Sequence, residues 1–434
     1  MRILLLYISE VSGHHQATIA IENALKLLDP EVEILNLNAF NYTNPITEKI
    51  INRLYLGVIK RTPGIWDYLY DNPAVVERTH KIKELIHKHN SPKLKKLFDE
   101  FRPNVVVCSQ AFPCGMVADF KKTYNSNIPL VGVLTDYAPH SYWIYDTVDY
   151  FVAPSQEVRD RFIQKGVAAE KIKVYGIPIG PKFALKHNKE ELAKGFGLSS
   201  EKPIILAMGG GQGLGPLNKI VSAFKKMRID SQLVVVAGSN KKLYRKLERR
   251  IKSHKKKIFL YKFISNIDEL MEIATLIITK AGGLTTAEAL SKGLPMVIIK
   301  PLPGQEEVNT TYFLNKGAAV KITNDKLIAQ FIQELISNPL TLKAMQEAAL
   351  KISRPRSSLD IAELILGLCS GIGKYALTGT SEILSYPAGG LLRGLQATPL
   401  KGDSERSERH RDEVPMDKKI PSQKVIPGVS EEFS

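Results

Sequence analysis

The sequence predicts an α/β protein with two parallel sheets, each covered by helices on both faces. Short apolar segments alternate with helical segments along most of the 434 residues, and such alternation is typical of βαβ units. The alternation runs twice, before and after a glycine- and proline-rich segment at 176–181, which favours a domain boundary there. We therefore expect an N-terminal domain at residues 1–180 and a C-terminal domain at 181–369.

The first series opens with an apolar strand at 2–8 and an amphipathic helix at 14–28. Parallel strands buried on both faces read as near-continuous apolar runs, and several such runs follow. Further strands of the first series are expected at 32–37, 104–108, 130–134, 148–153 and 171–175. Strands of the second series are expected at 203–208, 232–237, 258–261, 275–279, 295–300 and 318–322. Helices at 325–337, 339–351 and 356–368 are expected to close the second domain.

Two segments depart from this alternation of strands and helices. The stretch between Pro45 and Phe101 is helical, basic and aromatic, and its part at 49–70 could lie on an anionic lipid surface. The alternative is a solvated helix pair whose aromatic rings belong to the core. After about Gly371 a dense run of charges and prolines cannot bury enough apolar surface to offset its ordering entropy. We expect residues 370–434 to be a disordered tail.

The net charge of +16 favours a polyanionic partner, either nucleic acid, an anionic membrane surface or a phosphorylated ligand. No known nucleic-acid-binding module is apparent, so nucleic acid is not the expected partner. Three cysteines without paired spacing argue against a disulfide framework or a zinc site and favour a reducing compartment. No apolar run approaches the length of a spanning helix, about 18 residues. We expect a cytoplasmic protein that meets the inner face of the membrane from its surface.

A glycine-rich turn at 280–288 is the strongest functional signal. It follows an apolar strand and opens a helix, where unpaired N–H groups and the helix dipole favour an anion. One interpretation places a diphosphate against the N–H groups of Gly283, Leu284 and Thr285, with Lys280 as a nearby cation and Glu288 on a ribose diol. The other interpretation is an ordinary capping box, in which Thr285 caps the helix and Glu288 reaches back.

Two further turns support the first interpretation. The turn at 209–215 follows the first strand of the second domain, but it lacks the Gly-Lys-Ser/Thr ending of a P-loop. Asp230 does not lie at a strand end, so a nicotinamide fingerprint is weak. After a later strand, Gln305 and Glu306 open a helix and could bridge vicinal hydroxyls of a sugar. An acidic helix start is the equally simple alternative.

Candidate acid–base residues lie in the first domain. His14 follows the first strand, and a histidine with a pKa near neutrality suits a general base. Two adjacent histidines cannot both point into one cleft, and we favour His14 over His15. Asp136 and His140 follow another strand and could orient the base or hold an acceptor, unless they simply form a turn. No Asp-X-Asp triplet is present, so we expect helix ends and Lys280, rather than a metal, to stabilise a leaving group.

Two such domains facing one cleft form the GT-B architecture. The chain resembles the monogalactosyldiacylglycerol synthase and processive diacylglycerol glucosyltransferase family, and more distantly the GlcNAc transferase of lipid II synthesis. The resemblance covers roughly residues 1–368. The segments that carry it are 279–285, 301–309, Gly13-His14, 61–66, Thr135-Asp136 with His140 and Trp143, and 175–178. Two departures are Ala281, where the family commonly has proline, and a first loop with fewer glycines than many members have.

The resemblance implies inverting transfer of a hexose from UDP-glucose or UDP-galactose to the hydroxyl of diacylglycerol. Besides the UDP-sugar donor, we expect no metal or other cofactor. By that likeness, Glu288 holds the ribose and His14 is the family's histidine in the acceptor-side loop. The remaining donor contacts would be the backbone at Phe263 and Ile264 for uracil, Gly211, Gly283, Leu284 and Thr285 for the diphosphate, and Gln305 and Glu306 for the sugar.

Three alternatives remain open at this point. The chain could transfer GlcNAc to a polyprenyl-linked acceptor, or it could be a UDP-sugar epimerase of the same fold. The basic charge alone would also fit a non-enzymatic binder of membranes or nucleic acid. The choice between glucose and galactose, the number of sugars added and the oligomeric state do not follow from the sequence.

Overall fold

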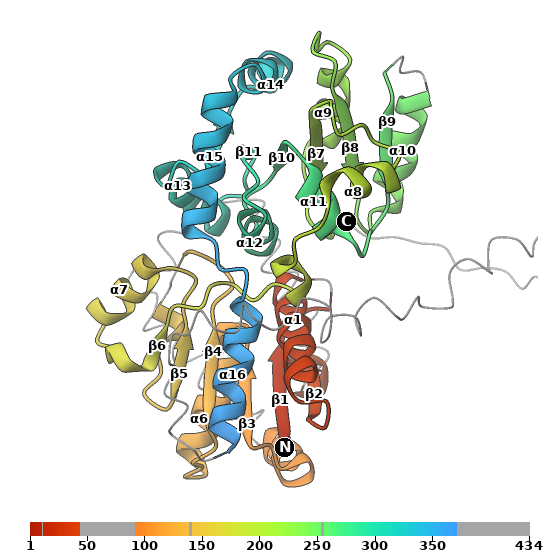
Figure 1. Ribbon diagram of the computed structural model, residues 1–434. Helices are drawn as coiled ribbons and strands as arrows, with labels where there is room; N and C mark the ends of the chain where they lie inside the picture. Colours follow the sequence, from red (N-terminus) through yellow and green to blue (C-terminus); the bar gives the residue numbers. More distant parts are fainter. Residues whose placement is uncertain (11, 44–91, 139–140, 253–255, 371–434) are drawn as a thin grey trace, which may run out of the picture. The chain divides into compact units, whose positions relative to one another are not determined.

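The computed structural model describes residues 1–10, 12–43, 92–138, 141–252 and 256–370, which belong to one compact unit. Within these residues the strands form two six-stranded sheets, and every pairing is parallel (Figure 1). This confirms the predicted architecture of two parallel sheets with helices. The segment 49–70, His140 and the tail from 371 lie outside the described residues.

The first sheet has the strand order β2-β1-β3-β4-β5-β6. Its central strand β1 pairs with β2 on one side and β3 on the other, so that Leu4 lies opposite Leu35 and Val106. From β1 the chain adds β2 on one side of the sheet and then β3 on the other, so the strand order reverses between β1 and β3. The strands are β1 Arg2–Tyr7, β2 Glu33–Asn38, β3 Val105–Cys108, β4 Leu130–Val133, β5 Tyr150–Val152 and β6 Ile172–Lys173.

The second sheet has the order β12-β11-β10-β7-β8-β9, which is the doubly wound arrangement of dinucleotide-binding folds. Its reversal point lies between β7 and β10. Strand bounds agree with the sequence-based expectation to within two residues in both sheets. The strands are β7 Ile204–Met208, β8 Gln232–Val236, β9 Ile258–Tyr261, β10 Leu276–Thr279, β11 Met296–Ile299 and β12 Ala319–Ile322.

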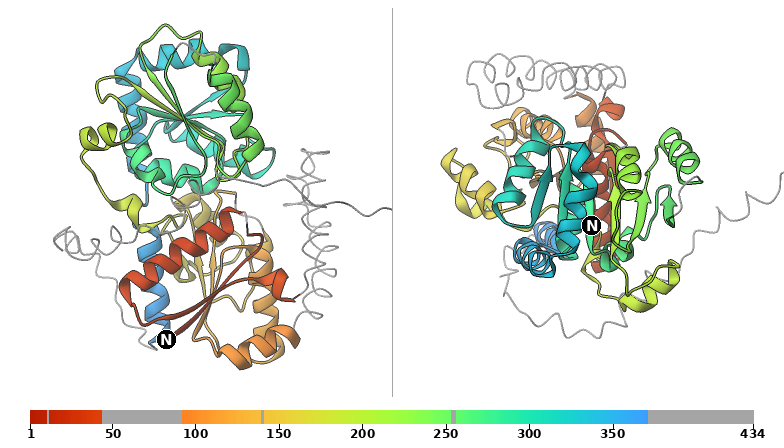
Figure 2. Two further views of the ribbon diagram at one scale, coloured as in Figure 1. Left: turned by 90° about the vertical axis from the view of Figure 1, so that its right-hand side faces the viewer. Right: turned by 90° about the horizontal axis from the view of Figure 1, so that it is seen from above.

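Helices cover both faces of each sheet, as the views in Figure 2 show. Alternate strand residues enter opposite cores, so Leu4 and Leu6 pack on one face of the first sheet and Ile3 and Leu5 on the other. Around the first sheet the helices are α1 Gly13–Leu28, α2 Ala39–Thr43, residues 92–101, α6 Ala111–Thr123, α7 Gln156–Gln164 and α16 Ser357–Cys369, with 3₁₀ turns η1 Ser141–Trp143 and η2 Ala169–Lys171.

Helices of the second sheet begin after a linking 3₁₀ turn, η3 Pro181–Ala184. Their buried residues form one core on each face of this sheet. They are α8 Lys189–Gly195, α9 Leu217–Phe224, α10 Lys241–Lys252, α11 Ile267–Ile273, α12 Gly283–Ser291, α13 Gln305–Asn315, α14 Ile328–Ile336 and α15 Pro339–Ile352, with η4 Asp325–Leu327 before α14.

The last helix departs from the expectation. A helix was expected at 356–368 to close the second domain, but α16 packs instead on α1 and on the first sheet (Figure 1). Ile361, Ala362 and Ile365 are fully buried in the same core as Ile3 and Leu5. The chain therefore returns to the first sheet after building the second. The predicted boundary at residues 180 and 181 stays a prediction.

Candidate functional site

A pocket of about 510 Å³ lies at the carboxyl ends of strands from both sheets. Its walls are the loops after β1 and β4 of the first sheet and the loops after β7, β8, β9 and β10 of the second. Ligands of open parallel sheets bind at this edge, near the point where the strand order reverses. The predicted residues that line it are His14, Asp136, Gly211, Phe263, Ile264, Lys280, Gly283, Leu284, Thr285 and Glu288.

The amino end of α12 opens into this pocket. Gly282 is its N-cap, and no side chain within the described ranges caps this end. The capping-box alternative is therefore wrong, because Thr285 lies within the helix instead of before it. The Thr286 hydroxyl donates to the carbonyl oxygens of its own turn, Gly282 or Gly283, at 2.9 Å. The first N–H groups of α12 stay available for an anion from the pocket.

Close approach at Gly283 joins the two halves of the pocket. A Cβ at this position would lie 2.0 Å from the carbonyl oxygen of Thr135 and 3.2 Å from Oδ1 of Asp136. Only a residue without a side chain fits there. The start of α12 thus touches the loop after β4, which carries a predicted catalytic residue.

The glycine-rich turn after β7 lies beside the same helix end. A Cβ on Gly210 would lie 3.8 Å from the Thr285 hydroxyl, whereas a Cβ on Gly211 would meet no atom within 4 Å. The turn is closed by a hydrogen bond from the Gly213 N–H to the Gly210 carbonyl at 2.9 Å. The space above Gly211 faces the pocket, and a diphosphate could enter it.

His14 lies in the first turn of α1 and lines the pocket. Its Nδ1 lies 2.9 Å from the carbonyl oxygen of Ser109 and 2.9 Å from Oγ1 of Thr135. A carbonyl can only accept, so Nδ1 carries the proton and the neutral ring keeps its lone pair on Nε2. Burial lowers the pKa of His14 from its ordinary value, against the opposing hydrogen bond to Ser109. The neutral form is therefore favoured at pH 7.

His15 is placed differently from its neighbour. Its ring stacks on Tyr7, with ring centroids 4.0 Å apart, and its Nδ1 lies 2.9 Å from the carbonyl oxygen of Glu10. It is not among the residues that line the pocket. Only His14 of the pair can therefore serve the site.

Asp136 is held by a residue that the sequence reasoning did not single out. Asn309 of α13 donates through Nδ2 to Oδ1 of Asp136 at 3.3 Å and to the carbonyl oxygen of Ala281 at 2.9 Å. Its Oδ1 accepts from the N–H of Tyr137 at 2.9 Å. Asn309 is fully buried, so it ties the loop after β4 to the loop after β10.

The carboxyl of Asp136 is strongly perturbed. Burial raises its pKa to about 7, and nearby Glu306 adds to the rise, while Asn309 and Lys280 oppose it. Among the described residues, no hydrogen bond joins Asp136 to His14. That Asp136 assists His14 in catalysis stays a prediction.

Lys280 and Glu306 form an ion pair beside the pocket. Oε2 of Glu306 also accepts from the N–H of Leu302 at 2.8 Å. Gly304 is the N-cap of α13, and its φ of +87° and ψ of −121° are a conformation that favours glycine. Gln305 and Glu306 do not line the pocket as it stands. Their contact with a sugar stays a prediction.

Glu288 lines the pocket on α12, which contacts η3. Burial raises its pKa to about 8, with Lys182 opposing and Asp268 adding to the rise. Lys182 itself pairs with buried Asp268 at 2.7 Å. Phe263 is 64% exposed nearby. Lys182 and Asp268 were not anticipated, because they follow no recognised motif.

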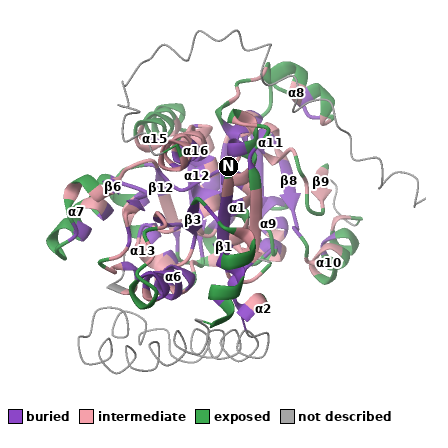
Figure 3. Cartoon of the chain, turned by 90° about the horizontal axis from the view of Figure 1, so that it is seen from below, coloured by how far each residue is buried: buried purple, intermediate pink, exposed green. Residues whose placement is uncertain are grey.

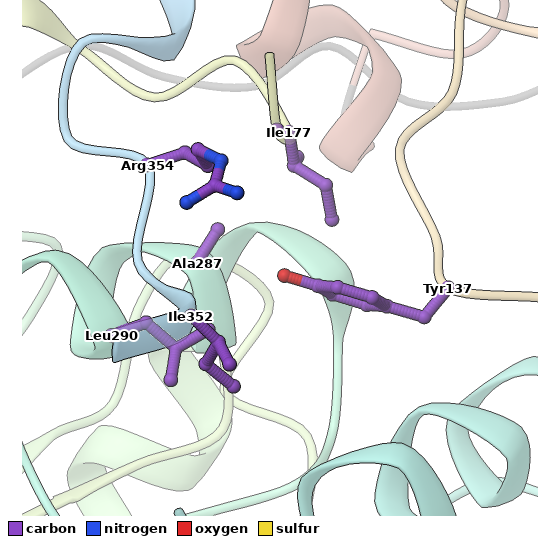
Figure 4. Close-up of a pocket in the computed structure, with 7 residues that line it drawn as sticks. Tyr137, Ile177, Ala287, Leu290, Ile352 and Arg354 are labelled. Carbon is purple, nitrogen blue, oxygen red and sulfur yellow. The ribbon is translucent and has the colours of Figure 1, made fainter. Parts of the chain in front are cut away.

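A second cavity, of about 10 Å³, has room for roughly one water molecule. Tyr137 and Arg354 approach it from opposite sides, with the Tyr137 hydroxyl directed into it (Figure 4). The Tyr137 ring also stacks on Tyr312 of α13, with centroids 4.4 Å apart. The loop after β4 is therefore packed firmly against α13. Trp143, which supported the resemblance, is buried in the core of the first sheet.

Within the described ranges, no group of three or more His, Cys, Asp or Glu side chains is arranged to hold a metal ion. In the same part of the chain, no helix has the length and apolar character needed to cross a bilayer.

Comparison with known proteins identifies both halves of the chain. Residues 14–179 match the family described as monogalactosyldiacylglycerol (MGDG) synthase, and residues 204–362 match the glycosyltransferase family 28 C-terminal domain. A processive diacylglycerol beta-glucosyltransferase of Bacillus cytotoxicus is 32% identical over 84% of this chain and 93% of its own length. Its counterpart in Bacillus thuringiensis is 30% identical with the same coverage.

Solved structures show the fold. The MurG structure from Acinetobacter baumannii covers 84% of this chain and 99% of its own, with a TM-score of 0.59 at 16% identity. UDP-GlcNAc 2-epimerase from Neisseria meningitidis covers 84% and 100%, with a TM-score of 0.54 at 15% identity. The fold is GT-B, as expected. The chain belongs to the monogalactosyldiacylglycerol synthase and processive diacylglycerol glucosyltransferase family, and it is a hexosyltransferase enzyme.

Proposed function

We propose that the protein transfers a hexose from a UDP-sugar to the hydroxyl of diacylglycerol or of a glycosyl-diacylglycerol, with inversion at the anomeric carbon. The relatives are named diacylglycerol beta-glucosyltransferases, which supports this acceptor and makes UDP-glucose the first donor to test. UDP-galactose is the alternative, given the name of the family that matches residues 14–179. UDP-glucose carries an α-linkage, so a β-product requires inversion.

The donor half of the proposal rests on the second sheet. The uncapped end of α12 and the open space at Gly211 would receive the diphosphate. Lys280 would add a positive charge as the leaving group forms, so that stabilisation comes from the helix end and this cation. Glu288 would accept hydrogen bonds from the ribose, and the backbone near Phe263 would hold uracil.

The catalytic half rests on one observation, the orientation of His14. Its Nδ1 is held by the Ser109 carbonyl, which leaves Nε2 free to take the proton of the acceptor hydroxyl. The hydroxyl oxygen then bonds to the anomeric carbon while the bond from that carbon to the diphosphate oxygen breaks. UDP departs with the electron pair toward α12.

The test is His14→Ala, with His15→Ala as the matched control. We expect His14→Ala to lower kcat by about 10²- to 10⁴-fold, as expected for loss of a general base, while UDP affinity measured by calorimetry changes little. His15→Ala should keep turnover, because its ring stacks on Tyr7 outside the pocket. Turnover in His14→Ala equal to that of the wild type would exclude the proposed role.

The same assay separates transfer from epimerisation. UDP release that requires added diacylglycerol supports transfer. Inversion of the sugar without any acceptor would support an epimerase, which shares this fold. Mass spectrometry of the lipid product gives the number of sugars added. Chromatography of the sugar released from that lipid distinguishes glucose from galactose, which have the same mass.

A further inference from the structure

Helix α10 carries an unusually dense positive charge on the outer side of the second sheet. Its sequence KKLYRKLERRIK contains seven basic residues and one acidic residue. Leu247 is buried, while the basic residues of the helix are exposed. In Figure 3, α10 is largely green, the colour of exposed residues. The helix is amphipathic: its apolar face packs on the protein and its basic face is exposed to solvent.

Few of these charges are paired by the part of the chain that the structure describes. Among the described residues, six cations of α10 form no ion pair, namely Lys241, Lys242, Arg245, Lys246, Arg249 and Lys252. Other surface helices do pair their charges at a spacing of four residues, as Glu22 with Lys26 in α1 and Lys343 with Glu347 in α15. Single lysines of other helices, such as Lys194 in α8, are also unpaired among the described residues, so the notable feature of α10 is that six such cations share one helix.

The arrangement also opposes the stability of the helix itself. Lys241 and Lys242 lie in the first turn, where the helix dipole disfavours cations. Like charges lie four residues apart, as in Lys242 with Lys246 and Arg245 with Arg249, and such pairs are destabilising. A sequence that keeps these charges is explained best by a polyanionic surface that binds them.

We propose that α10 docks on an anionic phospholipid surface. This inference rests on the proposed function, because a diacylglycerol acceptor lies in a membrane. The turn that lines the pocket at Gly238 and Ser239 leads directly into α10 at Lys241. Docking through α10 therefore keeps the rim of the pocket beside the lipid.

The helix lacks the features of a site for single-stranded nucleic acid. Such sites stack bases on exposed aromatic rings. The aromatic residue of α10, Tyr244, is half-buried, and Nζ of Lys262 lies 5.3 Å from its ring centroid. Cations without a stacking surface suit lipid headgroups, where each Lys or Arg near the surface contributes roughly fivefold to binding.

The test compares two variants of equal charge change in vesicle co-sedimentation. One variant is Lys242→Gln, Arg245→Gln, Lys246→Gln and Arg249→Gln. The control neutralises four exposed lysines of other helices of the second sheet, Lys189→Gln, Lys194→Gln, Lys343→Gln and Lys351→Gln. The vesicles contain phosphatidylcholine alone, or phosphatidylcholine with roughly 30 mol% phosphatidylglycerol to supply an anionic surface.

We expect wild type and control to bind the anionic vesicles alike, and the α10 variant to bind them at least about tenfold more weakly. The double variant Lys242→Gln, Lys246→Gln should show an intermediate loss, which guards against misfolding of the fourfold variant. Equal binding by the α10 variant and the control would overturn the inference. So would a loss confined to binding of duplex DNA, which would assign α10 to nucleic acid.

Activity keeps this test separate from the proposed function. With diacylglycerol dispersed in neutral detergent, the α10 variant should turn over as fast as the wild type. If the wild type shows no transfer to diacylglycerol, the proposed function fails, whatever the vesicles show. If transfer proceeds but charge on α10 does not affect vesicle binding, only the docking inference fails.

Discussion

Replacing Gly283 with alanine tests whether the two halves of the pocket meet as the structure shows. The added Cβ would lie 2.0 Å from the carbonyl oxygen of Thr135, whereas ordinary contact begins near 3.4 Å. The loop after β4 or the start of α12 must therefore move by about 1.4 Å. Overpacking of this kind costs about 1–3 kcal/mol of unfolding free energy, and a displacement of about 1 Å at a catalytic site costs roughly 10²-fold in rate.

The assay measures kcat for transfer to diacylglycerol and the urea midpoint of unfolding. We expect Gly283→Ala to lower kcat by about 10²-fold and to move the midpoint downward. Gly195→Ala is the matched control, because a Cβ at Gly195 in α8 meets no atom within 4 Å. The control should keep its activity. Wild-type turnover in Gly283→Ala would show that α12 and the loop after β4 are not in contact during catalysis.

Two further predictions concern polar groups of the site. Burial raises the pKa of Glu288 to about 8 from 4.5, so its contribution to stability is complete below about pH 4.5 and is lost as pH rises toward 8. Glu288→Gln cannot ionise, and its melting temperature relative to wild type should increase between pH 5 and pH 9; parallel curves would contradict the shift. Asn309→Ala leaves the Tyr137 N–H and the Ala281 carbonyl without their partner. It should lose at least about 1–3 kcal/mol in urea unfolding, and an unchanged midpoint would refute the bridge.

Much of the fold could be predicted because parallel strands are buried on both faces. Runs such as Ile204–Met208 and Met296–Ile299 are apolar throughout and end at turns, so their bounds follow from composition alone. The destination of α16 could not be predicted in this way. Its buried residues, such as Ile361 and Ile365, form an apolar stripe that fits either sheet. Periodicity identifies a helix but does not identify the surface that the helix covers.

The residues of the site likewise fall into those that the sequence reveals and those that only tertiary packing brings together. Glycines and polar residues that directly follow strands, such as Gly283 and His14, are brought to one edge by the parallel topology, and the sequence reveals them. Asn309 was quoted only as part of a motif, because its partners Asp136 and Ala281 come from different sheets. The pairing of Lys280 with Glu306 likewise depends on how two loops pack. Contacts between loops follow from tertiary packing, which local sequence does not encode.

The pH dependence of turnover can tell which group takes the proton. A general base must be unprotonated, so kcat/KM rises with pH through the pKa of the base in the free enzyme. His14 is held by the neutral carbonyl of Ser109 instead of a carboxylate, and burial places its pKa below 6.5. If His14 acts alone, the acidic limb lies below pH 6.5. Asp136 has a pKa of about 7, so a limb near pH 7 that disappears in Asp136→Asn would show instead that ionised Asp136 is needed for the reaction.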